Sequence, residues 1–562
     1  MHTLDWIVLV ASLLFIVVYG LWKGKGSKNI RGYLLADRSM RWHTIAFSIM
    51  ATQASAITFL SAPGQAYTDG VRFVQFYFGL PIAMVVLCIT AVPIYHRLKV
   101  YTAYEYLEGR FDLKTRGLAA LLFLIQRGLA AGLTIFAPAL ILSIIFGWNI
   151  YITNLIIGVL VISYTASGGT KAVNYTNFHQ MGIIMTGMVC AFLVIIFLLP
   201  DDISFLEAVK VSGKMGKLNA LDFKFDLDNR YNFWSGILGG TFLALSYFGT
   251  DQSQVQRYLT GRSVAQSRLG LIFNGLVKIP MQFFILFIGA MVFVFYQFEK
   301  PPIFFNSYEI ENIKSSPYSK EFQELETGYS DALELKEDKV NQLVSAMRQG
   351  NPSLVNEAQT DLKEAQKNAN SIRDEAISLM QKNNPLMDPQ DTNYVFLAFV
   401  TKYLPVGLVG LIIAVIFAAS MSSTSSELNA LASTTVVDIY KRVIKKEGSD
   451  RHYLIASKLA TVFWGIYAIS LAQYASRLGS LIEAVNILGS LFYGTILGIF
   501  LVAFYFKSVR GTATFYAAIV AELAVVYCFI FTDISFLWYN AIGCSGVIIG
   551  AIMLNLIIKR ER

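Results

Sequence analysis

Long runs of apolar residues alternate with short polar connections along most of the chain. Thirteen of these runs come close to the roughly 20 residues that an α-helix needs to cross a bilayer. They cover residues 4–22, 43–68, 72–95, 117–146, 149–166, 178–200, 232–256, 267–297, 394–434, 453–475, 480–506, 511–531 and 535–558. The pattern predicts an all-α membrane protein with about thirteen transmembrane helices.

Two of the predicted helices are interrupted by polar residues, glycine or proline. The second contains the polar run 51–58 ahead of Pro63-Gly64, and the seventh contains Gly239-Gly240 ahead of the polar run 246–252. Because these helices lie five spans apart, they cross the membrane in opposite directions. Interrupted helices at matching places of two inverted halves point to the binding site of a secondary transporter. We therefore expect a core of two inverted five-helix repeats, built from spans 2–6 and 7–11.

The same pattern divides the chain into five parts. We expect an extra N-terminal transmembrane helix at 1–23, a first repeat at 42–200, a second repeat at 232–298 and 393–506, an insertion at 299–392, and two C-terminal transmembrane helices at 511–562.

The insertion is polar, and its periodicity indicates two helices, at about 316–349 and 353–384, separated by Gly350-Asn-Pro352. This predicts a helical hairpin outside the membrane. The hairpin is a lid, an inert insertion, or a docking element for an extracytoplasmic partner through 316–384.

Composition and charge fit this picture. Hydrophobic residues make up 55% of the chain, charged residues 15%, and the mean hydropathy is +0.52. The net charge of +8 does not indicate nucleic-acid binding, because the basic residues gather in alternate loops. The first six residues contain no Lys or Arg and the next loop contains six, so the positive-inside rule places the N-terminus outside and the C-terminus in the cytoplasm. We expect a multi-pass protein of the cell (plasma or inner) membrane.

The ninth predicted helix carries an unusual cluster of hydroxyl groups, at Ser422, Ser423, Ser425 and Ser426. Polar groups at membrane depth are costly and usually line an ion or substrate path. Oxygen ligands without a compensating positive charge suit a small alkali cation such as Na⁺. The alternative is that these serines only mediate helix packing.

Several motifs resemble those of one family. They are Ser61-Ala-Pro-Gly-Gln-Ala-Tyr67, Gly168-Gly-Thr-Lys-Ala172, Phe248-Gly-Thr-Asp-Gln-Ser-Gln-Val-Gln-Arg-Tyr258 and the segment Ser422–Tyr440. With them the chain resembles the solute:sodium symporters, which share the inverted-repeat fold of LeuT. Ala137-Pro-Ala-Leu140 and the Gln-Val-Gln-Arg-Tyr run look closest to the iodide, monocarboxylate and multivitamin branch. The resemblance implies Na⁺-coupled symport by alternating access.

The resemblance also implies a main sodium site between the second and ninth spans. Matched motif by motif, its ligands are backbone carbonyls and two hydroxyls, from Ala51, Ala54, Ala419, Ser422 and Ser423. Some members have a second site that combines the serines one turn on, here Ser425 and Ser426, with an aspartate in the sixth span. Asn177 replaces that aspartate here, so the anionic charge is missing and the second site is in question.

By the same match, the substrate would lie beside the two interrupted helices. Gln53, Ser55 and Thr58 are polar candidates on one side. Tyr247 matches an aromatic residue that closes the pocket from the cytoplasm in sugar-transporting relatives, and Asn486 matches a substrate-binding amide. Hydrogen bonding between helices is the alternative for each of these side chains.

Arg127 stands about ten residues into the fourth span, roughly 15 Å deep, where a guanidinium needs an anionic partner. The partner is either a substrate carboxylate or an internal acid, for which Asp251 and Glu483 are candidates. We expect a symporter that imports a small organic solute. The first case indicates a carboxylate or other anion and is the main hypothesis, and the second indicates a neutral solute such as a sugar or polyol and is the alternative.

Two classes of function compete for this scaffold. One is a Na⁺-coupled symporter, and the other is a membrane solute sensor with the hairpin as its partner surface. A sensor would be expected to carry a cytoplasmic signalling domain, and the chain ends four residues after the last predicted span, which favours the symporter. We expect no enzyme activity, because no nucleophile and base pattern is present, and no ATP-driven pump, because the phosphate-loop motif is absent.

Overall fold

The computed structural model describes residues 2–24, 30–475 and 480–560, and these residues are almost entirely helical. The first half of the chain forms α1 Thr3–Gly24, α2 Ile30–Leu35, η1 Ala36–Arg38, α3 Trp42–Gln53, α4 Ala56–Asp69, η2 Gly70–Tyr77, α5 Leu80–Ile89, α6 Ala91–Leu98, α7 Glu105–Arg110, α8 Leu113–Phe146, α9 Ile150–Phe197, α10 Phe205–Lys214, η3 Ser235–Gly239, α11 Gly240–Gly249, α12 Gln252–Leu259 and α13 Val264–Phe298. The second half forms α14 Ser307–Lys314, α15 Ser319–Gln349, α16 Pro352–Asn383, α17 Thr392–Tyr403, α18 Leu408–Thr434, η4 Thr435–Ile444, α19 Asp450–Ala472, α20 Leu481–Tyr505, α21 Gly511–Phe531 and α22 Phe536–Arg560.

The described residues include nine helical stretches that are long and apolar enough to cross a membrane. They are Ala56–Leu98, Leu113–Ser143, Val173–Phe197, Val264–Phe298, Leu408–Ile444, Asp450–Ala472, Leu481–Tyr505, Gly511–Phe531 and Phe536–Ile558. Shorter apolar helices occur at Thr3–Phe15, Ile150–Ser163 and Ser235–Gly249. Together these stretches overlap every predicted span, with the second and third predicted spans joined in Ala56–Leu98. The all-helical class predicted from the sequence is confirmed.

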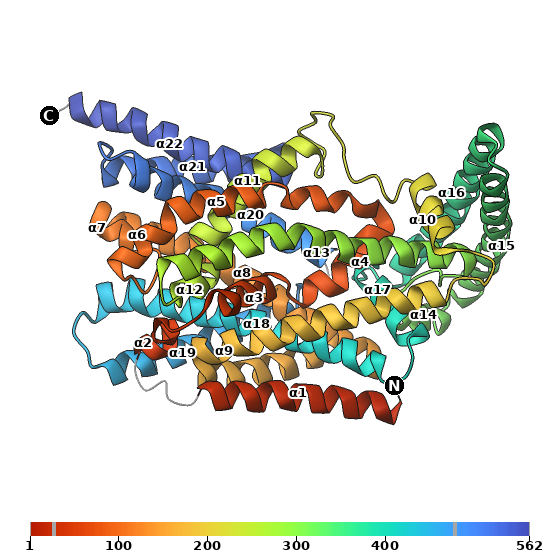
Figure 1. Cartoon of the computed structure of the whole chain (residues 1–562), viewed down its shortest axis with the longest axis horizontal. Coiled ribbons are helices and arrows are strands. Elements are labelled where there is room, and N and C mark those ends of the chain that lie inside the picture. Colours follow the sequence, from red (N-terminus) through yellow and green to blue (C-terminus); the bar gives the residue numbers. More distant parts are fainter. Residues whose placement is uncertain (1, 25–29, 476–479, 561–562) are drawn as a thin grey trace.

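The long helices lie side by side along the long axis of the molecule (Figure 1). The N-terminus lies at the same end as the pair α15 and α16, and the C-terminus lies at the opposite end. The C-terminal helices α21 and α22 pack together and α22 also packs along α20, at the edge of the bundle.

Two helices are broken in the middle of the bundle. The first break separates α3 from α4 at Ala54 (φ −87°, ψ 67°) and Ser55, whose extended backbone (φ −69°, ψ 174°) redirects the chain. The second break separates α11 from α12 at Thr250 and Asp251. The Asp251 carboxylate accepts a hydrogen bond of 2.8 Å from the backbone N–H of Ser253 and so caps α12. Both breaks fall within the polar runs that interrupt the predicted helices.

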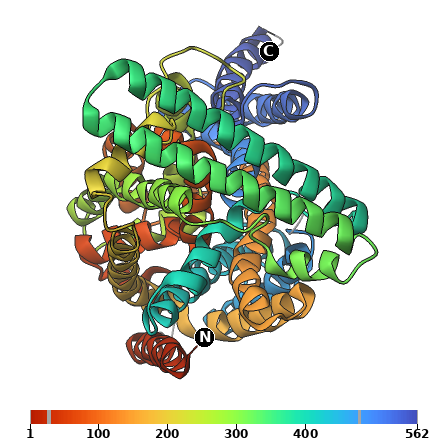
Figure 2. The same cartoon turned by 90° about the vertical axis from the view of Figure 1, so that its right-hand side faces the viewer.

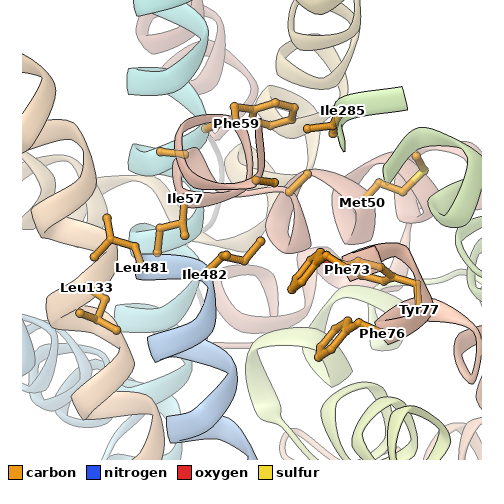
Figure 3. Close-up of a cluster of buried hydrophobic side chains, with 14 of the residues drawn as sticks. Met50, Ile57, Phe59, Phe73, Phe76, Tyr77, Leu133, Ile285, Leu481 and Ile482 are labelled. Carbon is orange, nitrogen blue, oxygen red and sulfur yellow. The ribbon is translucent and has the colours of Figure 1, made fainter. Parts of the chain in front are cut away.

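Buried apolar side chains from several helices cluster near the first break (Figure 3). They are buried and include Ile57 and Phe59 of α4, Phe73, Phe76 and Tyr77 of η2, Leu133 of α8, Ile285 of α13, and Leu481 and Ile482 of α20. Irregular backbone is tolerated at membrane depth only where protein or a polar cavity covers it. This cluster provides that cover.

The second half of the first broken helix, α4, packs very closely against the backbones of two neighbouring elements. A Cβ atom built on Gly64 of α4 would lie 1.8 Å from the carbonyl oxygen of Thr392 in α17. A Cβ atom on Gly289 of α13 would lie 2.1 Å from the carbonyl oxygen of Pro63. Glycine at these two places therefore lets α4 pack directly against the backbones of both neighbours.

The insertion forms a long helical hairpin, α15 and α16, which crosses one end of the bundle (Figure 2). Its turn uses Gly350 at φ 69°. The buried Lys336 of α15 donates a hydrogen bond of 3.0 Å to the carbonyl of Tyr296, in the last turn of α13. Arg373 of α16 pairs with Asp391 at 2.6 Å, and Asp391 also accepts from the backbone N–H of Phe305. The hairpin is thus tied to the ends of the helices that flank it.

Lys336 makes the attachment of the hairpin sensitive to pH. Burial lowers the pKa of its ammonium from 10.5 to about 8. Between these values the unfolded chain retains the Lys336 proton and the folded chain does not, so stability rises with pH by at most about 1.4 kcal/mol per unit. We expect melting temperatures measured from pH 8 to pH 10 to rise more steeply in the wild type than in Lys336→Met. The exposed Lys320→Met is the matched control, and equal slopes in all three proteins would contradict this role of Lys336.

Candidate sodium and substrate sites

A cavity of about 90 Å³ lies between the two broken helices. Its walls come from the α3–α4 break, from η2 and α5, from α8, from α11 and from α20. The structure brings to it all six side chains that the sequence assigned to the substrate: Gln53, Ser55, Thr58, Arg127, Tyr247 and Asn486. Aromatic and aliphatic side chains complete the walls, and they include Phe76, Tyr77, Leu80, Leu243, Phe248, Ile482, Val485 and Tyr493.

The uncharged polar groups of the cavity come mostly from the first break. Ser55 begins α4 without capping it through its side chain, and Thr58 lies one turn further on. The buried Oε1 of Gln53 has no hydrogen-bond partner among the described residues. Because a buried amide oxygen without a partner is costly, it indicates a group that accepts a hydrogen bond from a bound solute or water.

Arg127 lies at one end of the cavity in a buried ionic cluster. Its guanidinium pairs with Asp251 at the second break, with Glu427 of α18 at 3.1 Å, and with the hydroxyl of Tyr493 at 2.6 Å. The Tyr493 hydroxyl also donates to Asp251 at 2.8 Å, and Thr134 donates to Glu427 at 2.8 Å. One guanidinium thus faces two carboxylates, and all three groups are at least 90% buried.

Of the two acids predicted as partners for Arg127, the structure pairs it with Asp251. Glu483 lies elsewhere, where it pairs with Arg230 at 2.7 Å and accepts from Tyr231 at 2.8 Å. Sequence reasoning missed Glu427 and Tyr493. Glu427 had a usable signal, because it is an acid in an apolar helix directly after the serine cluster, whereas nothing distinguishes Tyr493 among 29 tyrosines.

Tyr247 lies beside this cluster. Its ring centroid is 5.6 Å from the Arg127 guanidinium carbon, and its hydroxyl accepts a hydrogen bond of 2.6 Å from Gln254 of α12. It therefore bridges the two halves of the second broken helix at the wall of the cavity.

The predicted main sodium ligands lie where α18 passes the end of α3. Ala51, Ala54, Ala419, Ser422 and Ser423 are all at most 2% exposed. At the end of α3 the Met50 carbonyl accepts from the backbone N–H of Ala54, and the Gln53 carbonyl accepts from the Thr58 hydroxyl. The Ser423 hydroxyl lies 3.3 Å from the carbonyl oxygen of Thr52. This carbonyl was not among the predicted ligands.

Asn177 of α9 connects the same two helices. Its side-chain oxygen faces the Ser422 hydroxyl, and its NH₂ group donates to Ser48 and to Thr52 of α3 at 3.2–3.4 Å. The neighbouring serines are placed differently. Ser426 donates to the Ser422 carbonyl at 2.8 Å, and both Ser425 and Ser426 are buried. Within the described part of the chain, Asn177 thus contacts Ser422 of the main set rather than the pair one turn on.

Residues 33–304 and 383–521 match the sequence model described as the sodium:solute symporter family. The chain belongs to this family. The matched segments leave out 305–382, so the hairpin of this symporter lies outside the family pattern.

Two relatives are transporters of the predicted branch. The symporter is 27% identical to the sodium-coupled monocarboxylate transporter 1 of Xenopus laevis, over 90% of its own length and 68% of the relative. It is also 27% identical to a putative sodium-dependent multivitamin transporter of Drosophila melanogaster, over 90% and 70%. The predicted family and branch are confirmed, as is Na⁺-coupled symport rather than an enzyme activity.

One solved structure has the same fold. It is a Na⁺-coupled sialic acid symporter in a substrate-bound outward-open state, with a TM-score of 0.74 and 24% identity over 99% of this chain and 98% of that one. The symporter is accordingly a multi-pass membrane protein with the fold of that transporter.

Ser423→Ala tests the main sodium site. The change removes one of few oxygen ligands, so we expect Na⁺ affinity to fall at least tenfold, about 1.4 kcal/mol. Ser433→Ala is the matched control, because Ser433 is a buried serine of the same helix that bonds within it, to the Ala430 carbonyl at 3.0 Å. The Na⁺ dependence of uptake and of the melting temperature measures the effect. Equal Na⁺ dependence in both variants would show that Ser423 is not a sodium ligand.

Proposed function

We propose that this symporter uses the sodium gradient to import a small neutral polar solute of the sugar or polyol class. The observation that carries the proposal is the ionic cluster at the cavity: the charge of Arg127 is already neutralised by Asp251 and Glu427. A solute anion at this end would therefore approach a group of side chains with one net negative formal charge.

The remaining groups of the cavity suit a neutral solute. Gln53, Ser55, Thr58 and Asn486 offer amide and hydroxyl groups that donate or accept hydrogen bonds without a charge. The aromatic side chains offer apolar faces to carbon-bound hydrogens. Pockets for small molecules commonly combine such an apolar wall with a few polar groups that fix the orientation.

A monocarboxylate is the second candidate. It is supported by the monocarboxylate-transporting relative and by the guanidinium of Arg127 at the cavity wall. For a carboxylate to bind there, Arg127 would have to exchange at least one of its two internal partners for the solute. Bidentate pairing of arginine with carboxylate would favour that exchange.

We propose that the cotransported sodium ion binds between the end of α3 and α18. Its ligands would be Ala51, Ala54, Ala419, Ser422 and Ser423. Such an ion would hold the broken helix and α18 together. Glu427 lies one turn beyond Ser423 on α18 and contacts Arg127, which lines the cavity, so α18 connects the proposed sodium ligands to the wall of the substrate cavity. By linkage, Na⁺ and solute raise each other's affinity by the same factor.

The topology proposed for the membrane has thirteen spans, with the N-terminus outside and the C-terminus cytoplasmic. It is supported by the alternation of basic loops and by the positions of the termini at opposite ends of the bundle. The domain boundaries proposed from the sequence follow from it. The hairpin then lies outside the cell membrane, where residues 316–384 are available to an extracytoplasmic partner.

The number of sodium ions carried per transport cycle can be tested through Asn177. With an uncharged amide in place of an acid, we expect one Na⁺ per transport cycle and a Hill coefficient near one. Asn177→Asp places a negative charge beside Ser48 and beside Ser422, a proposed ligand of the main site, so it should raise the apparent Na⁺ affinity of that site. Two ions per cycle counted in the wild type by flux ratio would contradict this expectation.

Arg127 is the test of the substrate class. Arg127→Gln strands two buried carboxylates, so we expect a loss of stability of several kcal/mol. The double variant Arg127→Gln with Asp251→Asn has the same net charge as the wild type and should recover much of the melting temperature. Arg230→Gln is the control, because that side chain is 57% exposed in its pair with Glu483.

Solute binding is measured in the same proteins. Thermal shifts with sugars, polyols and monocarboxylates, with and without Na⁺, identify the class that binds the wild type. If the Arg127→Gln variant is stable and loses only its thermal shift with monocarboxylates, the proposed substrate class changes from a neutral solute to a monocarboxylate.

A further inference from the structure

A single acidic residue lies in the middle of the membrane-crossing helix α21. Glu522 stands eleven residues after the start of this helix, about 17 Å along it at the helical rise. Two nearby residues of the same helix, Val520 and Leu523, are each 64% exposed and belong to an apolar face that suits lipid. At this depth a carboxylate is costly unless a cation is paired with it.

Both carboxyl oxygens of Glu522 are buried, although the residue as a whole is partly exposed. Neither oxygen has a hydrogen-bond partner among the described residues. The polar group that approaches the carboxyl is the hydroxyl of Thr495 on α20. Thr495 is 0% exposed, and its hydroxyl likewise forms no hydrogen bond with a described residue. Two buried polar groups that lack partners therefore lie next to each other, which is rare in native proteins.

Glu522 and Thr495 lie where α20, α21 and α22 meet. A Cβ atom built on Gly543 of α22 would lie 3.2 Å from the Thr495 hydroxyl oxygen, so α22 closes one side of the pair. A Cβ atom on Gly546 would lie 3.2 Å from the Cβ atom of Ala521, the residue before Glu522. Glycine and alanine at these contacts bring the three helices close together around the carboxyl.

Within the described part of the chain, no charge compensates Glu522. Helices α20, α22 and α8 pack against α21. The titratable groups in the middle turns of these four helices are Tyr516, Tyr527 and Cys528 on α21, Tyr493 on α20, Cys544 on α22 and Arg127 on α8. The other titratable groups of α20, α22 and α8 lie in the first or last turns. None of these groups acts electrostatically on Glu522, and Arg127 and Tyr493 are both engaged with Asp251.

We propose that Glu522 is a proton-binding site, in which the carboxyl is neutral and its O–H donates to the hydroxyl oxygen of Thr495. A proton suits this pair because a hard metal cation takes several oxygen ligands, and the described residues supply one carboxyl and one hydroxyl here. The bound proton removes the cost of a charge in the membrane interior. The site lies apart from the sodium and substrate ligands and goes beyond the function proposed above.

Thr495 connects this proton to the wall of the substrate cavity. It follows Tyr493 by two residues on α20, and the same helix brings Asn486 to the cavity. Loss of the proton would leave a carboxylate between α20 and α21, where the described residues offer it no cation. The contact between the two helices would then weaken, so the proton makes the position of a cavity helix sensitive to pH.

A hydrophobic carbodiimide tests for the neutral carboxyl, with the full chain in lipid vesicles. The carboxyl proton moves to a nitrogen of the reagent while a carboxyl oxygen bonds to its central carbon. The acyl group then migrates to a nitrogen and leaves a stable adduct, which mass spectrometry of peptides locates. We expect labelling at Glu522 in the wild type and no label at this position in Glu522→Gln.

Asp251 is the internal control for this reaction, because its pairing with Arg127 keeps it charged. Labelling at Asp251 should be at least about tenfold lower than at Glu522, since each unit of difference in proton affinity changes the protonated fraction about tenfold. The reaction is repeated with Na⁺ replaced by N-methylglucamine. Labelling at Glu522 that only the absence of Na⁺ permits would identify a metal cation as the occupant and overturn the proton site.

Melting temperatures in detergent from pH 5 to pH 8 give a second readout. An unfolded glutamate loses its proton near pH 4.3, about the value for a free side chain, whereas the folded site retains it. Unfolding then releases a proton, so the stability of the wild type falls as the pH rises. Glu522→Gln keeps the shape and the neutrality of the protonated side chain, so it should lack this fall and melt above the wild type at pH 8. Titrations elsewhere in the protein cancel in the comparison.

The role of Thr495 is tested at pH 5. Thr495→Val should lower the melting temperature more in the wild type than in a Glu522→Met background, because only the wild type loses a hydrogen bond to the carboxyl. Thr514→Val is the matched control, since Thr514 is a buried threonine of α21 that donates to the Arg510 carbonyl at 3.1 Å. It should have the same effect in both backgrounds.

Three results would overturn the proposal. They are the absence of labelling at Glu522, a pH slope of the wild type equal to that of Glu522→Gln, and an equal effect of Thr495→Val in both backgrounds. The proposed sugar or polyol class would stand in each case, because none of the proposed substrate ligands lies on α21.

Discussion

A backbone that crosses a bilayer must satisfy its hydrogen bonds within the protein, and this symporter departs from that rule at two places. Each break frees carbonyl and N–H groups in the centre of the bundle. Side chains around each break offset the cost of these freed backbone groups. Apolar side chains seal the first, and the Asp251 carboxylate caps the second. The cavity lies between the two broken helices, with the first break and α11 in its walls.

The ionic cluster connects the second break to the helices that carry ions. Arg127 of α8 reaches Asp251 at the break and Glu427 on α18, while Tyr493 brings in α20. A buried ion pair adds little to stability compared with apolar packing, but losing one partner is costly. The cluster therefore fixes the relative positions of four elements more than it strengthens the fold. A shift of any one of these four elements would therefore disturb its contacts with the other three.

Much of this architecture follows from the sequence alone. Apolar runs predicted the long helices, and the polar runs at 51–58 and 246–252 marked the two breaks, because polar residues inside a membrane helix are costly unless they line a path. Six substrate candidates from separate segments line one cavity.

The choice of partners was beyond the reach of the sequence. Asp251 and Glu483 were both candidate partners for Arg127, and only three-dimensional packing shows that Asp251 is a partner and that Glu483 pairs with Arg230 instead.

The close backbone contacts of Gly64 and Gly289 have a mechanical consequence. They bring the second half of the broken helix, α4, into direct backbone contact with α17 and α13. The hairpin is fastened to the end of α13 through Lys336 and to the start of α17 through Asp391. In the proposed topology the hairpin, α13, α17 and α4 form one connected unit. It extends from the extracellular space to the wall of the cavity. A molecule that binds the hairpin would hold α4 in place and so inhibit transport without entering the transport path.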